Sequence, residues 1–151
     1  MWTFRQSDGF LLDPSGKVAG QGYSGHGAGI DDPQDQNVPD VGPIPVGNWT
    51  IGAPIDSPSH GPFAMPLTPL PGTNTFGRTF FFIHGDEVEN PGLELASKGC
   101  VVLARNLRQA VWNSGDHILA VVSGLAVEPT PPAPNPQQIV AQPIQTQQEQ
   151  S

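Results

Sequence analysis

The chain has few charged residues and a marked shortage of positive ones. Lys, Arg, Asp and Glu make up 13% of its 151 residues, and 6 basic against 14 acidic side chains leave a net charge of −8. Nucleic acids and anionic membrane surfaces both require a positive patch on a binding protein, so the composition argues against either partner. No window approaches the roughly 18 consecutive apolar residues of a membrane-spanning helix, so we expect no membrane span.

Cysteine is almost absent. A single cysteine, Cys100, cannot form an internal disulfide, so folding does not require an oxidising compartment. The first residues, MWTFRQSDGFLL, lack the basic stretch and long apolar run of a secretory signal peptide. We therefore expect a protein that is made in the cytoplasm and does not use the general secretory route.

Glycine and proline are abundant, at 18 residues each, which favours turns and short strands over long helices. Alternating or continuous apolar runs predict the strands. They are a meander over 1–24, a strand over 48–53, a short edge strand FAMPL (63–67), a buried strand RTFFFIHG (78–85), a short strand CVVL (100–103) and a last strand HILAVV (117–122). Segments 25–43 and 54–62 are expected to be loops.

One short helix is expected over RNLRQAVWNSG (105–115). Leu107, Ala110 and Val111 would share its core-facing side, and Gly115 would end it. The sum is a mainly β domain over 1–123, a small β-sandwich or barrel. Residues 124–151 hold six Pro and seven Gln but few large apolar side chains, which predicts a disordered tail or linker.

The segment FFFIHGDEVENPGLELASKGCVVL (80–103) carries the strongest chemical signal. Only a thiolate is a good nucleophile, so a catalytic Cys100 needs a base, and His84 at the end of the buried strand is the natural candidate. Gly99 permits a sharp turn before Cys100, so that the amides of both residues would form an oxyanion hole. The Ser97 hydroxyl would add a third donor.

A structural interpretation of the same residues stays open. A single cysteine beside an apolar VVL run is commonly a buried small hydrophobe, and a histidine at a strand end is usually structural. What favours catalysis is the combination: glycine follows His84 and precedes Cys100, and the most apolar strand of the chain delivers the histidine.

Four motifs extend this pattern: GYSG (22–25), GPIPVGNWTI (42–51), GRTFFFIHGD (77–86) and ASKGCVVL (96–103), the last followed by Arg108 in the helix. Together they resemble the L,D-transpeptidase (YkuD-type) family, and within it the Tlde branch of type VI secretion effectors. The resemblance runs from Trp2 to Val122.

The resemblance implies a β-rich fold and a cysteine enzyme acting on peptidoglycan stem peptides. Cys100 would attack the carbonyl of the diacid residue ahead of a terminal D-alanine, and His84 would take the thiol proton and return it to the leaving amine. Water would complete a carboxypeptidase reaction, and a free D-amino acid an exchange. It also implies delivery by the secretion apparatus into the periplasm of a target bacterium, and an immunity protein in the producer.

The match has one departure. Most housekeeping L,D-transpeptidases carry histidine directly before Gly-Cys, where this chain has Lys98, so His84 is the only motif histidine. It stays open whether Asp86 or a backbone carbonyl fixes the tautomer of His84. Arg108 would bind the substrate carboxylate or form a surface salt bridge.

Tyr23 and Ser24 of the GYSG motif would line the cleft or form a turn with a packed tyrosine. His26, His60 and His117 lie in loops or at a strand start, and no pair has the spacing of a metal motif, so we expect no metal or other cofactor.

Two other functions compete with the transpeptidase hypothesis. NlpC/P60 endopeptidases are also cysteine hydrolases, but their nucleophile precedes the histidine in the chain, the reverse of the order here. The other alternative is a non-catalytic wall-binding or secreted β-domain with an inactive site.

Overall fold

The computed structural model describes residues 1–86, 97 and 99–124. Residues 87–96, which separate the motifs of His84 and Cys100, lie outside the described residues, as do Lys98 and the expected tail from 125 onward. The described part contains ten strands, one α-helix and two short 3-10 helices. Their bounds are β1 Trp2–Arg5, β2 Phe10–Leu12, β3 Val18–Gln21, β4 Tyr23–Ser24, η1 Gly27–Gly29, η2 Pro33–Asp35, β5 Gly47–Ile51, β6 Ile55–Ser57, β7 Gly61–Pro69, β8 Phe81–His84, β9 Val101–Val102, α1 Arg105–Asn113 and β10 Ile118–Val122.

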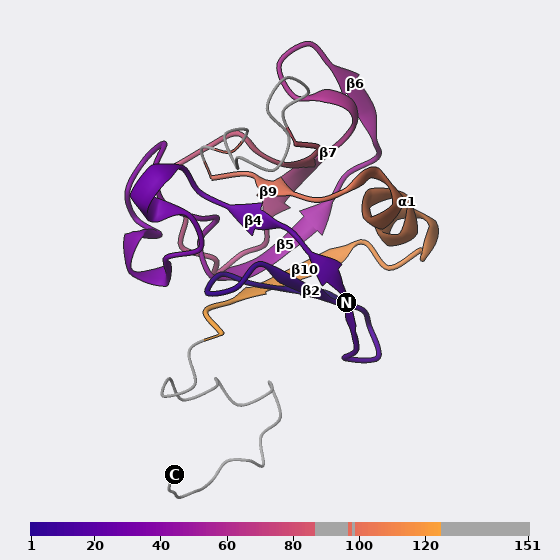
Figure 1. Cartoon of the computed structure of the whole chain (residues 1–151), viewed down its shortest axis with the longest axis horizontal. Helices are drawn as coiled ribbons and strands as arrows, with labels where there is room; N and C mark the ends of the chain where they lie inside the picture. The colour runs from indigo at the N-terminus through magenta and orange to yellow at the C-terminus, as the bar shows by residue number, and fades with distance from the viewer. Residues whose placement is uncertain (87–96, 98, 125–151) are drawn as a thin grey trace, which may run out of the picture.

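The strands form one sheet that nearly closes on itself (Figure 1). Their order is β3-β2-β1-β10-β5-β7-β8-β9-β4, with β6 paired to β7 outside this path. The two edge strands, β3 and β4, are consecutive in the chain and are joined by Gly22 alone. The polypeptide therefore bridges the gap between the two edges, and the expected mainly β, barrel-like fold with one short helix is confirmed.

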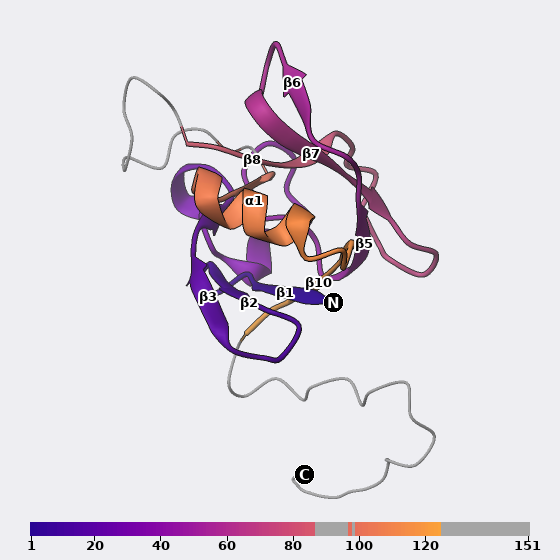
Figure 2. The ribbon, with the colours of Figure 1, turned by 90° about the vertical axis from the view of Figure 1, so that its right-hand side faces the viewer.

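Large apolar side chains fill the interior of this sheet. Trp49 and Phe4 are completely buried, and the Trp49 ring meets Phe81 edge to face, with ring centroids 5.0 Å apart. The helix α1 covers one end, between β8 and the β2–β3 pair (Figure 2). The side chain of Leu107 lies over Gly20 of β3, where a Cβ atom would leave it too little room.

The buried face of α1 differs in part from the expected one. Val111 is completely buried and Leu107 is half-buried, but Ala110 is exposed and Arg108 is buried in its place. The guanidinium of Arg108 bonds to backbone carbonyls, which compensates for the burial of its charge. Gly115 has a φ of 76° just past the helix end, as expected for a residue that ends a helix.

The segment FAMPL is not an edge strand, as its proline had suggested. It lies within β7, which pairs with β5 on one side and β8 on the other. The ladder to β5 ends at Ile51, and the next contact is from the Gly52 N–H to the Pro66 carbonyl. Pro66 thus sits where its missing N–H interrupts no ladder bond.

Two further expectations need correction. The expected loop 54–62 contains β6, which forms a hairpin with the start of β7. The apolar run RTFFFIHG is not buried throughout, because β8 begins only at Phe81 and Phe80 is 84% exposed with a φ of 65°. A bulky residue in the left-handed region is strained, and such strain is often found beside functional sites.

Replacing Gly22 by alanine should destabilise the barrel. A Cβ atom at this position would overlap the Val102 carbonyl oxygen and crowd the Leu103 side chain, although the φ of Gly22 does not itself require glycine. We expect Gly22→Ala to lower the free energy of unfolding by about 1–3 kcal/mol in urea denaturation. Gly16→Ala is the control, since its Cβ meets open space and only its φ of 91° opposes alanine. Equal stability of Gly22→Ala and the wild type would contradict this role.

Candidate active site

The parallel pairing of β8 with β9 brings His84 and Cys100 together. In this register Ile83 lies opposite Val101 and His84 opposite Val102. Side chains two residues apart on an extended chain point to the same face, so Cys100, two residues before Val102, is a diagonal neighbour of His84. One ring nitrogen of His84 and the Cys100 Sγ lie within 4.8 Å of each other.

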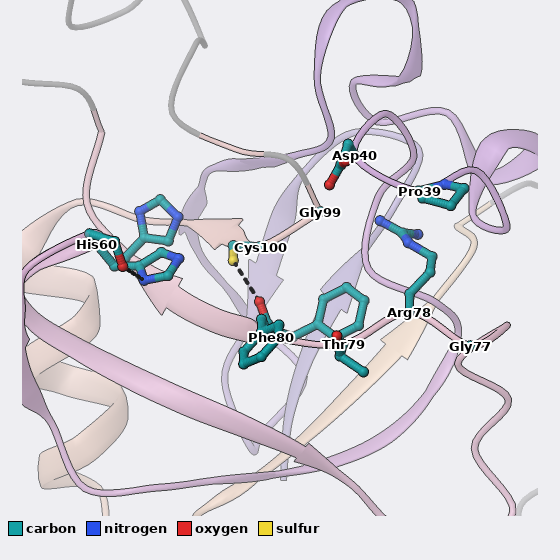
Figure 3. Close-up of a pocket in the computed structure, with 12 residues that line it drawn as sticks. Pro39, Asp40, His60, Gly77, Arg78, Thr79, Phe80, Gly99 and Cys100 are labelled. Atoms are coloured by element: carbon teal, nitrogen blue, oxygen red, sulfur yellow. Dashed lines mark hydrogen bonds between the residues drawn. The ribbon is translucent and has the colours of Figure 1, made fainter.

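Both side chains face a cavity of about 560 Å³. His84 is 3% exposed and Cys100 is 7% exposed, so each presents only a small surface, and it does so at the cavity wall. Figure 3 shows Cys100 between His60 on one side and Arg78 and Asp40 on the other. The Cys100 thiol donates to the Phe80 carbonyl oxygen, with Sγ 3.6 Å from that oxygen. The other lining residues are Pro39, Ser59, Gly77, Thr79, Phe81 and Gly99.

A backbone carbonyl fixes the tautomer of His84. The Nδ1 atom is 2.8 Å from the Gly85 oxygen, and a carbonyl oxygen can only accept, so Nδ1 carries the proton and Nε2 keeps a lone pair. Nε2 is buried and has no hydrogen-bond partner among the described residues. Of the two orienting groups left open by the sequence, the structure therefore selects the carbonyl. The Asp86 carboxylate instead accepts a hydrogen bond from the Tyr23 hydroxyl at 2.9 Å.

Burial keeps both the Cys100 thiol and the His84 imidazole neutral near pH 7. It raises the pKa of the Cys100 thiol to about 11, although the Phe82 amide and the positive charge of Arg78 act in the opposite direction. Burial also lowers the pKa of His84, against the opposing effect of its hydrogen bond to Gly85. The resting site is thus a thiol facing an imidazole, and not a preformed ion pair.

Two buried serines hold the backbone around Cys100. The Ser97 hydroxyl donates to the Cys100 carbonyl at 2.6 Å and accepts from the amides of Gly25 and Gly99 at 3.0 Å each. The Ser24 hydroxyl donates to the Gly99 carbonyl at 3.1 Å and accepts from the Ile44 amide. The GYSG motif and the cysteine turn are therefore one hydrogen-bonded unit.

These contacts change what two expected site residues can do. The Gly99 amide, expected to contribute to an oxyanion hole, already donates to Ser97. The Ser97 hydroxyl, expected as a further donor, is completely buried and already bonds to the Cys100 carbonyl. In this arrangement both residues shape the turn that carries Cys100.

Arg108 is 6% exposed and is not among the cavity-lining residues. Its Nε donates to the Leu103 carbonyl, and its Nη1 donates to the carbonyls of Pro62 and Phe63. It therefore ties α1 to the chain around β7 and β9. The arginine that lines the cavity is Arg78, whose guanidinium is held by the carbonyls of Gln36, Gly42 and Pro43.

His60 lines the site although its sequence context indicated only a loop or strand start. It precedes β7 at the β6–β7 hairpin, stacks on Phe82 with centroids 4.3 Å apart and lies 5.1 Å from the His84 ring. One ring nitrogen of each histidine and the Cys100 Sγ all lie within 4.8 Å of one another. Three separate segments supply this cluster, so no local spacing could have indicated it.

A family model described as the Tlde1 domain matches residues 19–123. The chain belongs to the Tlde1 domain family. The matched range contains His84, Cys100 and every residue that lines the cavity, and the family places this Tlde1 domain among type VI secretion effectors. No curated protein and no solved structure matches the chain. In the part of the chain that the structure describes, no helix is long and apolar enough to cross a bilayer.

The neutral state of the site predicts an unusual pH profile for alkylation. Because burial raises the pKa of Cys100 to about 11, the rate with iodoacetamide should rise about tenfold per pH unit from pH 7 towards pH 10, as the thiolate fraction grows. Mass spectrometry of the alkylated protein would measure this rate. Protein unfolded in urea is the control and should level off above a pKa near 8.5. A plateau below pH 8 in the folded protein would instead indicate a preformed ion pair.

Proposed function

We propose that this Tlde1 domain is a cysteine enzyme that cleaves or exchanges the terminal D-alanine of peptidoglycan stem tetrapeptides. The observation that carries this proposal is the unprotonated Nε2 of His84, which has no hydrogen-bond partner among the described residues. One nitrogen of this ring lies within 4.8 Å of the Cys100 Sγ, and both side chains line the cavity. A neutral base and a thiol in this arrangement suit nucleophilic attack on a carbonyl.

The reaction begins with general-base activation, because the resting thiol is protonated. The Cys100 thiol donates to the Phe80 carbonyl at 3.6 Å, and Nε2 has no hydrogen-bond partner among the described residues, so substrate binding must bring Sγ and Nε2 into a hydrogen bond. The thiol proton then passes to Nε2 as the sulfur–carbon bond forms. The Gly85 carbonyl, which accepts from Nδ1, stabilises the resulting imidazolium.

In the next step the bond between the diacid carbonyl and the D-alanine nitrogen breaks. His84 returns its proton to the leaving amine, and Cys100 is left as a thioester. Water then gives a tripeptide and free enzyme, or a free D-amino acid gives an exchanged tetrapeptide. Either reaction consumes the tetrapeptide that ends in D-alanine, which is the donor that a target cell needs for L,D-crosslinks.

The remaining residues stabilise the oxyanion, attract the substrate carboxylate and hold the backbone around Cys100 in position. With the Gly99 amide occupied by Ser97, we assign the oxyanion to the amide of Cys100 itself. Arg78 lines the cavity and favours the anionic form of the sulfur, so we assign it, in place of Arg108, the task of attracting the substrate carboxylate. Tyr23 and Ser24 support the turn and the strand end from behind.

The same proposal includes the setting of the reaction. The type VI secretion apparatus would deliver the domain to the periplasm of a competing bacterium, where stem peptides are accessible. The producing cell would then require an immunity protein that covers the cavity.

Purified tetrapeptide muropeptides provide the direct test. Wild-type protein should release D-alanine, and addition of another D-amino acid should shift the product mass to the exchanged tetrapeptide. Cys100→Ala should lower the rate at least about 1,000-fold, and His84→Gln at least about 100-fold. The control is His117→Ala, a histidine that stacks on Trp112 and does not line the cavity. Unchanged masses with both wild type and Cys100→Ala would favour a non-catalytic wall-binding domain.

A further inference from the structure

His60 has no part in the proposed reaction, yet it lies beside both reactive groups. The hairpin between β6 and β7 carries it to the cavity, where its ring is 5.1 Å from that of His84. The two imidazoles and the Cys100 thiol place three potential ligand atoms within 4.8 Å of one another. A cluster of this composition is the kind of donor set that binds a borderline or soft divalent cation.

The lone pair of His84 is already available to a metal. Its Nδ1 donates to the Gly85 carbonyl, which leaves Nε2 as the only ring atom that can coordinate. This nitrogen is buried without a hydrogen-bond partner among the described residues, on a side chain that is only 3% exposed. An unpaired buried polar atom is destabilising, and a bound cation would give it a partner.

His60 is held in a similar way. Its Nδ1 lies 3.0 Å from the Ser59 hydroxyl oxygen and 3.3 Å from that of Ser57. When Nδ1 donates to either oxygen, Nε2 keeps the lone pair. Stacking on Phe82, with centroids 4.3 Å apart, restricts the ring further. Both histidines thus have outer partners of the kind that orient metal-binding imidazoles.

The distances are compatible with a tetrahedral centre after a small adjustment. Zinc–nitrogen bonds of about 2.0 Å and zinc–sulfur bonds of about 2.3 Å place ligand atoms roughly 3.3–3.7 Å apart. The present atoms lie within 4.8 Å, so side-chain rotations that move them by about 1 Å would close the site. The fourth position would open into the cavity and hold a water molecule.

We propose that His60, His84 and Cys100 bind one Zn²⁺ ion, and that this ion reversibly inhibits the enzyme. Binding replaces the thiol proton, which is released to solvent, by a sulfur–zinc bond, so no oxidant or reductant is involved. The ion then coordinates both the Nε2 atom of His84 and the thiolate of Cys100, so the base and the nucleophile are blocked at the same time. The inhibitory effect rests on the proposed function, whereas the metal site itself does not.

Titration of the purified full chain with Co²⁺ tests the site without any substrate. Co²⁺ takes the place of Zn²⁺ in tetrahedral sites, and a thiolate ligand gives it an intense near-ultraviolet charge-transfer band. We expect this band to saturate at one ion per chain and to be absent in Cys100→Ala. His60→Ala should weaken the affinity at least about tenfold, and His117→Ala, outside the cavity, should match the wild type.

Turnover of tetrapeptide muropeptides tests the inhibition. Zn²⁺ should abolish wild-type turnover and a chelator should restore it, whereas His60→Ala should keep a larger fraction of its own chelator-treated rate. An absent charge-transfer band, or equal Co²⁺ affinity in His60→Ala and wild type, would overturn the metal site. Turnover that Zn²⁺ raises would overturn its inhibitory role. A Co²⁺ band in a protein that leaves muropeptides unchanged would sustain the site and reject only the proposed function.

Discussion

The parallel pairing of β8 with β9 is the contact on which the site depends. It places His84 opposite Val102 and leaves Cys100 at the entrance to β9, on the same side of the sheet. Adjacent hydrogen bonds reinforce this register, including one from the Leu103 amide to the His84 carbonyl. A slip by one residue would turn one of the two side chains to the opposite face and separate sulfur from imidazole.

Closure of the barrel supports this pairing from the other side. The strand β4 is the last in the sheet order and pairs with β9, with Tyr23 opposite Val102 and Ser24 opposite Val101. Gly22 joins β4 to the opposite edge of the sheet, so β9 is held between two strands although it is only two residues long. The serine hydroxyls at positions 24 and 97 complete the connection to the cysteine turn. The GYSG motif therefore serves the site by fixing the backbone behind it.

The sequence predicted much of this arrangement because short-range patterns determine it. Apolar periodicity and turn residues indicated most strands, the helix and its end at Gly115, and two glycine-flanked motifs indicated that His84 and Cys100 lie close together. Long-range pairing was the part that local patterns could not indicate. Pro66 suggested an edge strand, whereas its position in the interior of the sheet depends on where the β5 ladder stops. His60 joins the site only because the β6–β7 hairpin folds over β8, and Arg108 lost its expected exposure because nearby carbonyls accept its N–H groups.

The protonation state of the site links its two proposed activities. A preformed thiolate–imidazolium pair would be reactive at rest, and its protonated ring could not coordinate a cation. A neutral ring with its proton fixed on Nδ1 instead leaves the lone pair of Nε2 available to a proton or to a cation. When a substrate carbonyl lies beside the sulfur, Nε2 acts as the base that takes the thiol proton. When a divalent cation binds, Nε2 acts as a ligand. The burial that raises the pKa of Cys100 therefore keeps its thiol protonated until the imidazolium formed in the proposed reaction, or a bound cation, supplies the positive charge that stabilises the thiolate.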